Sequence, residues 1–353
     1  MRTPADDDLA GLGEWLRGTG PDADIAICTR VRFARNVDGY HFSTSMTELE
    51  SRELTTFLGK QLTRADFVEP LRLLTLPGLD DIERKVLMER HLISREHAES
   101  QKPRDVAVNA DESISIMINE EDHLRVQVFH SGRAIEATYR RAESLDDGIL
   151  QRISVAFSEE FGFLTACPTN AGTGLRVSVM LHLPALVWTD EIEKATHAAQ
   201  KAFMAVRGMY GEGSRALGDL YQVSNQVTLG RSESTIAADV ATAVERLLAW
   251  ERGVREALLS GEGRAKTLDR VFRSLGTLER ARILTSEEAL TCLSAVRFGV
   301  QQGLIDDLEM TQLNRALLLS QPAHLQRMEG RLLGPSERDS ERANLIRKLL
   351  GKA

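Results

Sequence analysis

Hydrophobic and polar positions alternate with a period of two in several short stretches of the first two thirds of the chain. The clearest case is Ser113–Asn119, where Ile114, Ile116 and Ile118 alternate with other residues, followed closely by the alternating stretch Leu124–Phe129. Successive side chains of a strand point to opposite faces, so this pattern predicts two strands joined by a short acidic turn. Further strands are predicted at 106–108, 175–183 and 221–229, and helices at 45–62, 81–91, 144–160 and 191–205.

The lengths of the connections predict the fold class. Several of the predicted strand pairs are joined by segments too short for a parallel crossover, so the sheet should be largely antiparallel. An antiparallel sheet flanked by helices is the α+β class.

The pattern changes to helical spacing from about residue 233 onward. Val240, Val244 and Leu247 share one helical face, and Thr285–Glu288 resembles a capping box that opens a later helix. A last helix is predicted from about 336 to 350, with Gly351 as its C-cap. We therefore divide the chain into a lead-in at 1–23, an α+β region at 24–255 and an all-helical C-terminal region at 256–353.

Composition and charge narrow the functional classes. The 353 residues are 42% hydrophobic and carry a formal net charge of −8, which argues against a general nucleic-acid-binding surface. The three cysteines lie far apart, as expected in a reducing compartment. No apolar run approaches the ~20 residues that cross a bilayer, and the N-terminus has Asp6–Asp8 instead of an apolar signal core. These features predict a cytoplasmic protein with no membrane contact.

A pair of arginines is the first candidate for chemistry. Arg30 and Arg32 lie in the segment Cys28–Asn36, and on a strand their side chains would point to the same face. Two guanidinium groups on one face match the oxygens of a phosphate. The alternative is a basic strand exposed to solvent.

The acidic turn Asn119–Arg125 is the second candidate. It places Glu120, Glu121 and Asp122 next to one another, and such carboxylates need nearby cations if they are buried. A carboxylate base beside fixed guanidinium groups suits transfer of an anionic group to a basic acceptor. The alternative is a solvated hairpin turn. His123 is expected to pack rather than to bind metal, because no second histidine lies at metal spacing.

Two glycine-containing loops complete the set. Cys167–Arg176 contains a proline and two glycines before a predicted strand, which lets backbone N–H groups approach an anion. A cysteine with arginines nearby would favour its thiolate form, although a structural cysteine before a turn is the alternative. Arg207–Ser214 has three glycines around Glu212 and could close over a substrate, or be an ordinary surface loop. No G-x-x-x-x-G-K-[ST] motif occurs, so a kinase built this way would need a cradle of arginines.

Taken together, the four motifs resemble those of the guanidino (phosphagen) kinases. R-x-R, N-E-E-D-H-L-R, C-P-T-N-x-G-T-G-L-R and R-G-x-x-G-E occur in the same order in that family, and the match runs from about 24 to about 255. Two features resemble the branch of bacterial protein arginine kinases (McsB type). The chain reaches the R-x-R block by Arg30 without a preceding helical domain, and it has a helical tail with the segment Arg338–Ala343.

The resemblance implies roles for individual residues. Glu121 and Glu212 would engage the acceptor guanidinium, with Glu121 as the base, and Cys167 would align that group. His91 would lie near the adenine. The triphosphate of ATP would be held by Arg30, Arg32, Arg125, Arg176 and Arg207, and phosphoarginine would be held by Arg338, Asp339 and Arg342.

Two positions depart from the family pattern, Ala171 where leucine is more usual and Val177 where alanine is common. Both changes concern packing rather than charge. Mg²⁺ is expected to be held mainly by the nucleotide, because no dedicated protein cage is visible in the sequence.

The function implied by the resemblance is ATP-dependent phosphorylation of exposed arginine side chains on proteins. It further implies marking of clients for a Clp-type protease and inactivation of a heat-shock repressor, and the candidate partners are a Clp ATPase, that repressor and an activator protein, although the sequence does not say whether an activator is required. The apolar surface of the helical tail indicates a homodimer. Two alternatives remain open from the sequence, a kinase for a small guanidino metabolite and a catalytically silent adaptor that binds phosphoarginine.

Overall fold

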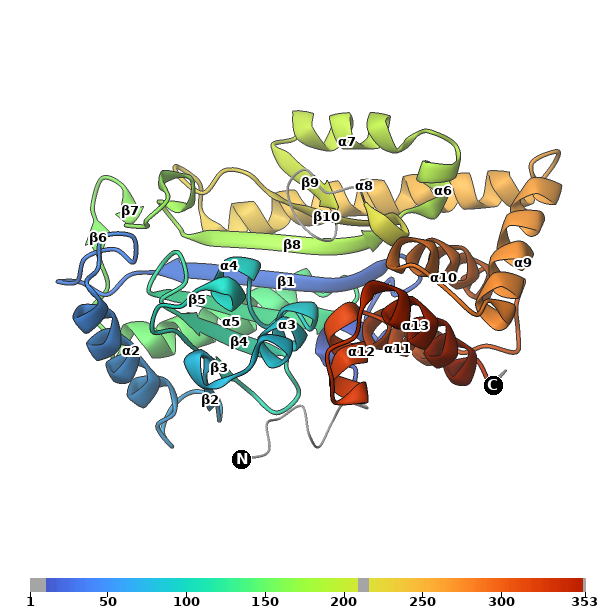
Figure 1. Ribbon diagram of the computed structural model, residues 1–353. Coiled ribbons are helices and arrows are strands. Elements are labelled where there is room, and N and C mark those ends of the chain that lie inside the picture. The colour runs from blue at the N-terminus through green and yellow to red at the C-terminus, as the bar shows by residue number, and fades with distance from the viewer. Residues whose placement is uncertain (1–10, 209–215, 352–353) are drawn as a thin grey trace.

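An eight-stranded antiparallel sheet forms the centre of the computed structural model, which describes residues 11–208 and 216–351 (Figure 1). The strand order is β2-β3-β4-β5-β1-β8-β10-β9, and all neighbouring strands pair antiparallel. Its strands are β1 (Ala26–Arg35), β2 (Arg72–Thr75), β3 (Asp105–Val108), β4 (Ile114–Ile118), β5 (Leu124–Ser131), β8 (Leu175–His182), β9 (Met204–Gly208) and β10 (Leu220–Asn225). A two-stranded hairpin of β6 (Phe157–Ser158) and β7 (Gly162–Phe163) is separate from it.

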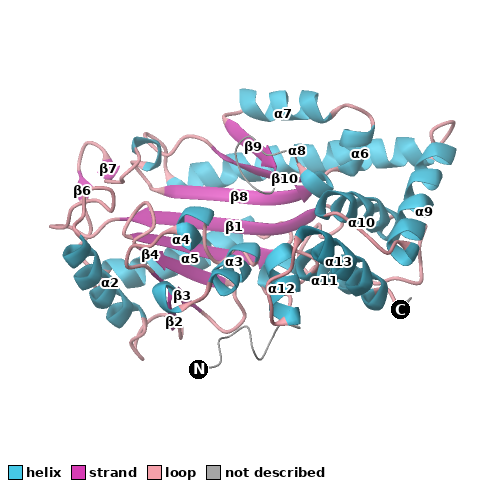
Figure 2. Cartoon of the chain, viewed as in Figure 1, coloured by secondary structure: helices cyan, strands magenta, loops and turns pink. Residues whose placement is uncertain are grey.

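Helices cover the sheet, as Figure 2 shows with the strands in magenta and the helices in cyan. The helices beside the sheet are α2 (Glu48–Leu62), α3 (Asp81–Glu89), α4 (Arg95–Glu99), α5 (Ile135–Leu150), α6 (Pro184–Trp188), α7 (Ile192–Lys201) and α8 (Glu233–Leu259). The C-terminal helices are α9 (Arg264–Arg280), α10 (Ser286–Gln301), α11 (Met310–Leu319), α12 (Pro322–Glu329) and α13 (Pro335–Leu349). Short 3₁₀ turns occur at Glu14–Leu16, Leu76–Gly78, Pro168–Asn170 and Leu217–Asp219.

The two faces of the sheet differ in chemistry because the strands alternate. One face carries Val31, Val126, Val177 and Val223, all with exposed fractions of 0%, and packs against α5 and α8. Residues paired directly across an antiparallel ladder lie on the same face. The pairs Arg32–Gln127, Arg32–Arg176, Arg30–Ser178, Ala34–Arg125, Ser224–Ser178 and Gln222–Arg207 therefore place their side chains together on the opposite face, here called the arginine face.

Apolar clusters cover the arginine face at its two ends and leave its middle polar. At one end α3, α4 and the segment between them pack Leu87, Leu92 and Ala98 with Val106 and Met117 of the sheet. At the other end the lead-in residues Trp15 and Leu16 join Cys28, Phe129, Met180 and, from the C-terminal helices, Leu290 and Leu318. The polar middle is thus bordered on two sides by packed apolar side chains.

The α+β class, the antiparallel sheet and the helical C-terminal region are confirmed. The acidic hairpin is confirmed as well, because β4 and β5 pair and Asn119 N donates to His123 O at 2.9 Å. The helix predicted at 144–160 is wrong in its limits, since α5 runs from Ile135 to Leu150. Its buried stripe of Ile135, Thr138, Ala142, Leu145 and Ile149 has helical spacing, but the charged residues between them obscure its start.

The predicted strand at 221–229 also ends early, at Asn225, and the residues after it form a loop that pairs with the segment after Cys167. The predicted division at residue 255 falls within α8 and stays a prediction. Within the described part of the chain, no helix is both long and apolar enough to cross a membrane.

Candidate active site

Four of the five predicted phosphate-binding arginines lie close together on the arginine face. Arg30 and Arg32 stand on the central strand β1, Arg125 on β5 and Arg176 on β8. The fifth, Arg207, lies at the end of β9, directly across from Gln222, whose Oε1 accepts a bond of 2.5 Å from Arg30 Nη2. Arg176 donates to Ser224 Oγ at 3.0 Å. The sheet register therefore gathers residues that are far apart in sequence.

The electrostatics of this group favour an anion. Burial, together with the positive charges of Arg125 and Arg176, lowers the pKa of Arg30 to about 10. The pKa of Arg32 lies well below its ordinary value, first because of burial and then because of the positive charges of Arg30, Arg125 and Arg176. Its Nε is buried and has no hydrogen-bond partner among the described residues. Several buried guanidinium groups that repel one another would be stabilised by a polyphosphate.

The three adjacent carboxylates of the acidic turn have three different environments. Glu120 is buried and accepts from Arg125 Nη1 at 2.7 Å and from Ser94 Oγ at 2.6 Å. Burial alone would raise its pKa, but Arg125 and these hydrogen bonds lower the pKa of Glu120 to about 2. The buried Glu120 carboxylate therefore holds the Arg125 guanidinium in position on the arginine face.

Asp122 links the turn to the cysteine loop. Its Oδ1 accepts from Asn36 Nδ2 at 2.7 Å and from the backbone N of Ala166 at 2.7 Å. Burial raises its pKa, while these bonds oppose the shift. Since Ala166 directly precedes Cys167, Asp122 holds the position of the predicted substrate-aligning residue.

Glu121 is the exposed member of the three. Partial desolvation and the charge of Asp122 raise its pKa, which makes it a better proton acceptor. Its Oε2 lies 3.5 Å from Asn170 Nδ2 in the cysteine loop. Cys167 itself is half-buried, and its Sγ lies 3.0 Å from Thr169 Oγ1. Glu121 and the Cys167 loop therefore meet beside the arginine face.

His123 has the packing role that the sequence predicts. Its Nδ1 accepts from Val37 N at 3.0 Å and its Nε2 bonds to His41 O at 2.8 Å, so both ring nitrogens are used inside the fold. Among the described residues, no group of three or more His, Cys, Asp or Glu side chains could hold a metal ion.

His91 borders the arginine face at the end away from Glu121. Its ring packs edge to face on Trp15, with 4.5 Å between the ring centroids, and its backbone has a φ of 60°. Burial, followed by the charge of Arg30, lowers its pKa to about 3, so the ring is neutral. Its Nε2 is buried without a hydrogen-bond partner among the described residues. Glu212, the second predicted acid, lies outside the described residues.

Five polar contributors were not predicted from the sequence. They are Glu120 as the partner of Arg125, Asp122 as the anchor of the cysteine loop, and the group Gln127, Gln222 and Ser224 on the arginine face. Alternation could have identified the last group, because Gln127 stands two residues after Arg125. The separate roles of Glu120 and Asp122 depend on contacts between distant segments, and no local pattern reveals them.

Comparisons with known proteins agree with this geometry. Residues 53–254 match the family model of the ATP:guanido phosphotransferase C-terminal catalytic domain, and residues 264–353 match that of the protein-arginine kinase McsB C-terminal domain. The protein-arginine kinase of Halothermothrix orenii is 44% identical over 96% of this chain and 97% of its own length. This chain belongs to the protein-arginine kinase family. The protein-arginine kinase of Geobacillus stearothermophilus is likewise 44% identical, over 96% of this chain and 94% of its own.

Solved structures of other guanidino kinases have a fold similar to that of this chain. The duplicated taurocyamine kinase of Schistosoma mansoni has a TM-score of 0.57 and 26% identity, covering 70% of this chain and 34% of its own. A lombricine kinase has a TM-score of 0.59 at 24% identity, covering 69% of this chain and 70% of its own. The latter likeness concerns the fold alone.

The tail motif of this protein-arginine kinase family member lies in α13. Arg342 is buried and donates to Ser320 O at 2.9 Å, to Leu284 O at 2.7 Å and to Asp339 Oδ1 at 2.6 Å. Arg338 and Asp339 are half-buried, and Arg338 Nη1 donates to Leu333 O at 3.0 Å. Arg342 is thus an internal brace, whereas Arg338 and Asp339 lie nearer the surface.

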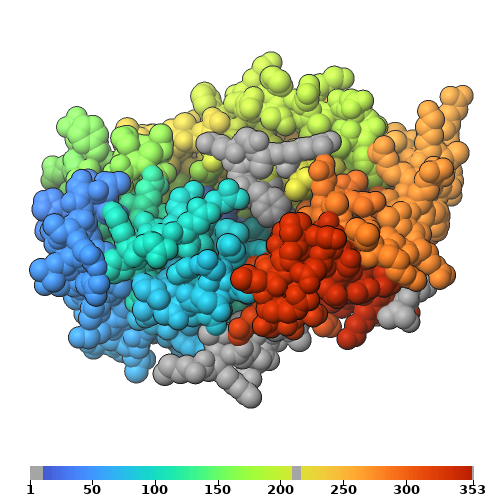
Figure 3. All heavy atoms as spheres, in the orientation of Figure 1, coloured from blue at the N-terminus to red at the C-terminus, as the bar shows by residue number. Residues whose placement is uncertain are grey.

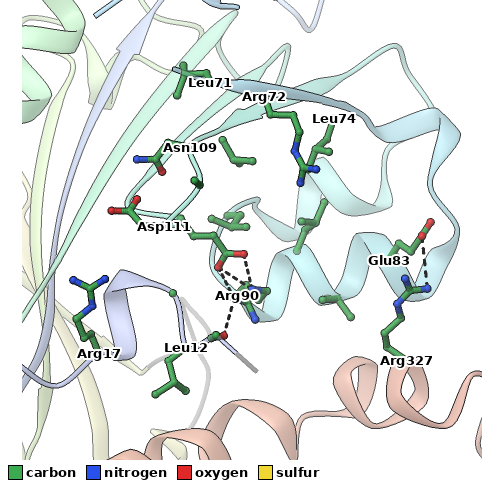
Figure 4. Close-up of a pocket in the computed structure, with 18 of the residues that line it drawn as sticks. Leu12, Arg17, Leu71, Arg72, Leu74, Glu83, Arg90, Asn109, Asp111 and Arg327 are labelled. Carbon is green, nitrogen blue, oxygen red and sulfur yellow. Dashed lines mark hydrogen bonds and ion pairs between the residues drawn. The ribbon is translucent and has the colours of Figure 1, made fainter. Parts of the chain in front are cut away.

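A large cavity, of about 1160 Å³, lies elsewhere, between α3, the lead-in and the C-terminal helices (Figure 4). Arg90 stands in its centre, where it bonds to Glu112 and to Gly11 O, while Arg327 from α12 pairs with Glu83 of α3. Of the described residues that line it, none is a predicted catalytic residue. Leu92, the neighbour of His91 in the sequence, is among its lining residues.

Proposed function

We propose that this member of the protein-arginine kinase family transfers the γ-phosphoryl group of ATP to arginine side chains of proteins. The observation that supports it is the meeting of the arginine face with Glu121 and the Cys167 loop at one end of the sheet. The arginine face would hold the anionic triphosphate, and Glu121 beside the Cys167 loop would offer a proton acceptor to a cationic substrate. Transfer of a phosphoryl group to arginine needs both.

The chemistry of the acceptor explains the second part. A guanidinium has a pKa above ~12 and is a poor nucleophile until it loses a proton. Glu121, at the exposed tip of the turn, would neutralise the incoming group and take that proton as the N–P bond forms. Cys167, positioned by Asp122, would orient the guanidinium, and Glu212 would be the second acid.

The arginine face would supply most of the transition-state stabilisation. Arg30, Arg32, Arg125, Arg176 and Arg207 would hold the triphosphate in line with the acceptor, so that positioning and charge neutralisation lower the barrier. The adenine would lie towards His91 and Trp15. Mg²⁺, held chiefly by phosphate oxygens and water, would neutralise part of the triphosphate charge.

The test is mass spectrometry of acceptors incubated with the protein, ATP and Mg²⁺. A protein acceptor should gain phosphate on arginine, whereas free arginine in a parallel reaction should remain largely unmodified. Modification of free arginine alone would favour a small-molecule guanidino kinase, and ATP binding without transfer to any acceptor would favour the silent adaptor.

The finer assignments rest on the family resemblance and on the tail. Arg338 and Asp339 would bind phosphoarginine and regulate the kinase, and the products would be clients marked for a Clp-type protease, with a heat-shock repressor and an activator protein as further partners. The sparse cysteines support a cytoplasmic location, and the helical region would form a homodimer.

A further inference from the structure

The β6–β7 hairpin exposes large apolar side chains beside the Cys167 loop. Phe157 is 59% exposed and Phe161 is 48% exposed, and the neighbouring loop after β10 exposes Val227 at 38% and Leu229 at 49%. Between the two phenylalanines, Glu159 and Glu160 are exposed as well. We define this surface as the collar: Phe157, Glu159, Glu160, Phe161, Val227 and Leu229.

Backbone contacts attach both parts of the collar to the cysteine loop. Phe163 N donates to Gly172 O at 2.8 Å, and Thr173 N donates to Thr228 O at 3.2 Å. Gly172 contacts both parts of the collar, the hairpin on one side and the loop after β10 on the other. A Cβ added there would lie 2.6 Å from Thr228 O, and one added to Gly162 would lie 2.6 Å from Gly172 O. Both glycines also have positive φ values, 97° and 70°, so the close approach depends on glycine.

The hairpin is held firmly rather than loosely. Phe163 packs on the guanidinium of Arg35, whose Cζ lies 3.6 Å from the ring centroid, and Arg35 is itself buried and paired with Asp146 at 2.6 Å. Phe157 then meets Phe163 edge to face at 5.3 Å. Phe157 therefore rests on the anchored Phe163 and points towards solvent. Exposure of this much apolar surface to water is unfavourable in free energy. Clustered exposed apolar side chains of this kind mark interaction sites.

The collar lies within reach of the reacting group. Gly172 follows Cys167 by five residues, so an extended chain could separate them by at most about 18 Å. Figure 1 shows β6 and β7 at the left end of the molecule, beyond the ends of β1 and β8, and Figure 3 shows the surface of this region standing out from the edge. A polypeptide whose arginine is placed at Glu121 would extend over this surface within about five or six residues of the target.

We infer that the collar is a docking surface for an extended segment of the substrate protein that carries apolar and basic residues near its target arginine. The occupant follows from the chemistry: the phenyl and leucyl groups fit apolar side chains, and Glu159 and Glu160 attract positive charge and repel acidic segments. Apolar side chains flanking an arginine become accessible where a protein is locally unfolded. This inference rests on the proposed function for the identity of the target.

Two peptide sets and two variants test it. The first peptide carries arginine with leucine and lysine neighbours, and the second carries the same arginine with glycine and aspartate neighbours. Binding is read from the fluorescence anisotropy of labelled peptides on the full chain, so it does not require catalysis. Phosphoryl transfer is measured separately as KM and kcat.

For Phe157→Ser/Phe161→Ser, we expect the Kd and KM of the first peptide to rise about tenfold with kcat and the KM for ATP unchanged. Glu159→Lys/Glu160→Lys, which leaves the packing on Phe163 intact, should weaken binding of the first peptide and improve that of the second. The matched control Leu49→Ser/Leu332→Ser removes side chains that are 67% and 75% exposed elsewhere, and should change neither peptide.

Equal affinity of the first peptide for the wild type and both collar variants would overturn the inference, as would tighter binding of the acidic peptide to the wild type. If peptides bind through the collar but gain no phosphate, the docking surface stands and the proposed function fails. If the collar variants transfer phosphate with unchanged KM values, the proposed function stands and the docking surface fails.

Discussion

At the scale of single residues, neighbouring positions in one turn differ in environment because the backbone points them in different directions. Glu120 is buried against Arg125, Glu121 is exposed beside the cysteine loop, and Asp122 is buried against Asn36 and Ala166. The mutual repulsion expected from three adjacent carboxylates is thus resolved by separate partners. One carboxylate is left accessible for chemistry.

The depressed pKa of Glu120 predicts a pH-dependent contribution to stability. Because its pKa falls from 4.5 to about 2 on folding, its ionised form stabilises the folded state above about pH 4.5, and this stabilisation is lost as the pH falls towards 2. Glu120→Gln should lower the free energy of unfolding at pH 7 by roughly 2–3 kcal/mol. The difference between the two proteins in denaturant unfolding should shrink as the pH falls from 4.5 towards 2. Glu53→Gln, an exposed carboxylate on α2, is the control and should have no effect; a constant difference at all pH values would contradict the assignment.

The buried position of Arg32 should make it unfavourable for the stability of the ligand-free protein and favourable for ATP binding. Its buried cation is repelled by Arg30, Arg125 and Arg176, so Arg32→Gln should raise the melting temperature of the ligand-free protein by about 2 °C. The same change should abolish the further rise that saturating ATP gives the wild type. Thermal unfolding with and without ATP measures both, with the exposed Arg52→Gln as control. A variant that is destabilised yet still stabilised by ATP would remove Arg32 from the phosphate site.

At the scale of elements, the sheet register brings the site together. The alternation of polar and apolar residues was sufficient to predict the β4–β5 hairpin and the shared face of Arg30 and Arg32. It could not predict that β1 lies between β5 and β8, because strand order depends on pairing between residues at least 89 positions apart. The limits of α5 and β10 were missed for a related reason, since their ends are set by contacts with other segments rather than by local spacing.

The motifs predicted which residues are chemically suited to the site, but not how they are held. Arginine spacing indicated a phosphate cradle, whereas the roles of Glu120 and Asp122 became visible only with their partners in place. Arg342 illustrates the same limit, because the sequence placed it with Arg338 and Asp339 and the fold gives it three internal hydrogen-bond acceptors.

The link between the acidic turn and the cysteine loop predicts a graded loss of activity. Asp122→Ala removes the acceptor of Ala166 N and should lower kcat about 10- to 100-fold while leaving the KM for ATP unchanged, since Cys167 would no longer be held in place. Asp122→Asn keeps one acceptor oxygen and should recover part of the rate. Steady-state kinetics on a protein acceptor distinguish these variants. If alanine and asparagine are equally active, Asp122 has no positioning role.

At the scale of the whole molecule, α10 connects the tail motif with the sheet. The residue before its N-cap, Leu284, donates to Asp339 O at 3.0 Å, and Ser294 in its middle donates to Asp219 Oδ2 at 2.5 Å, next to the start of β10. His182 at the end of β8 contacts the same serine at 2.8 Å. A ligand at the tail motif could therefore affect the edge of the sheet that carries Arg207.

This connection predicts the effect of phosphoarginine on activity. The free modified amino acid should stimulate transfer by the wild type and have no effect on Arg338→Ala, because that variant would lose the guanidinium that binds the phosphoryl group. Arg331→Ala, which removes an exposed arginine paired with Glu337, should respond like the wild type. Initial rates with and without phosphoarginine are the measurement. Equal stimulation of all three proteins would exclude the tail from regulation.

The central claim is that one end of the arginine face combines a triphosphate cradle with a carboxylate that activates the acceptor. Glu121→Gln tests it most directly, because the substitution keeps the size and exposure of the side chain and removes the proton acceptor. ATP affinity by calorimetry should stay within about twofold of the wild type, while kcat for a protein arginine acceptor should fall about 10²- to 10⁴-fold. A variant that transfers phosphate at the wild-type rate, or that loses ATP binding together with activity, would contradict the account.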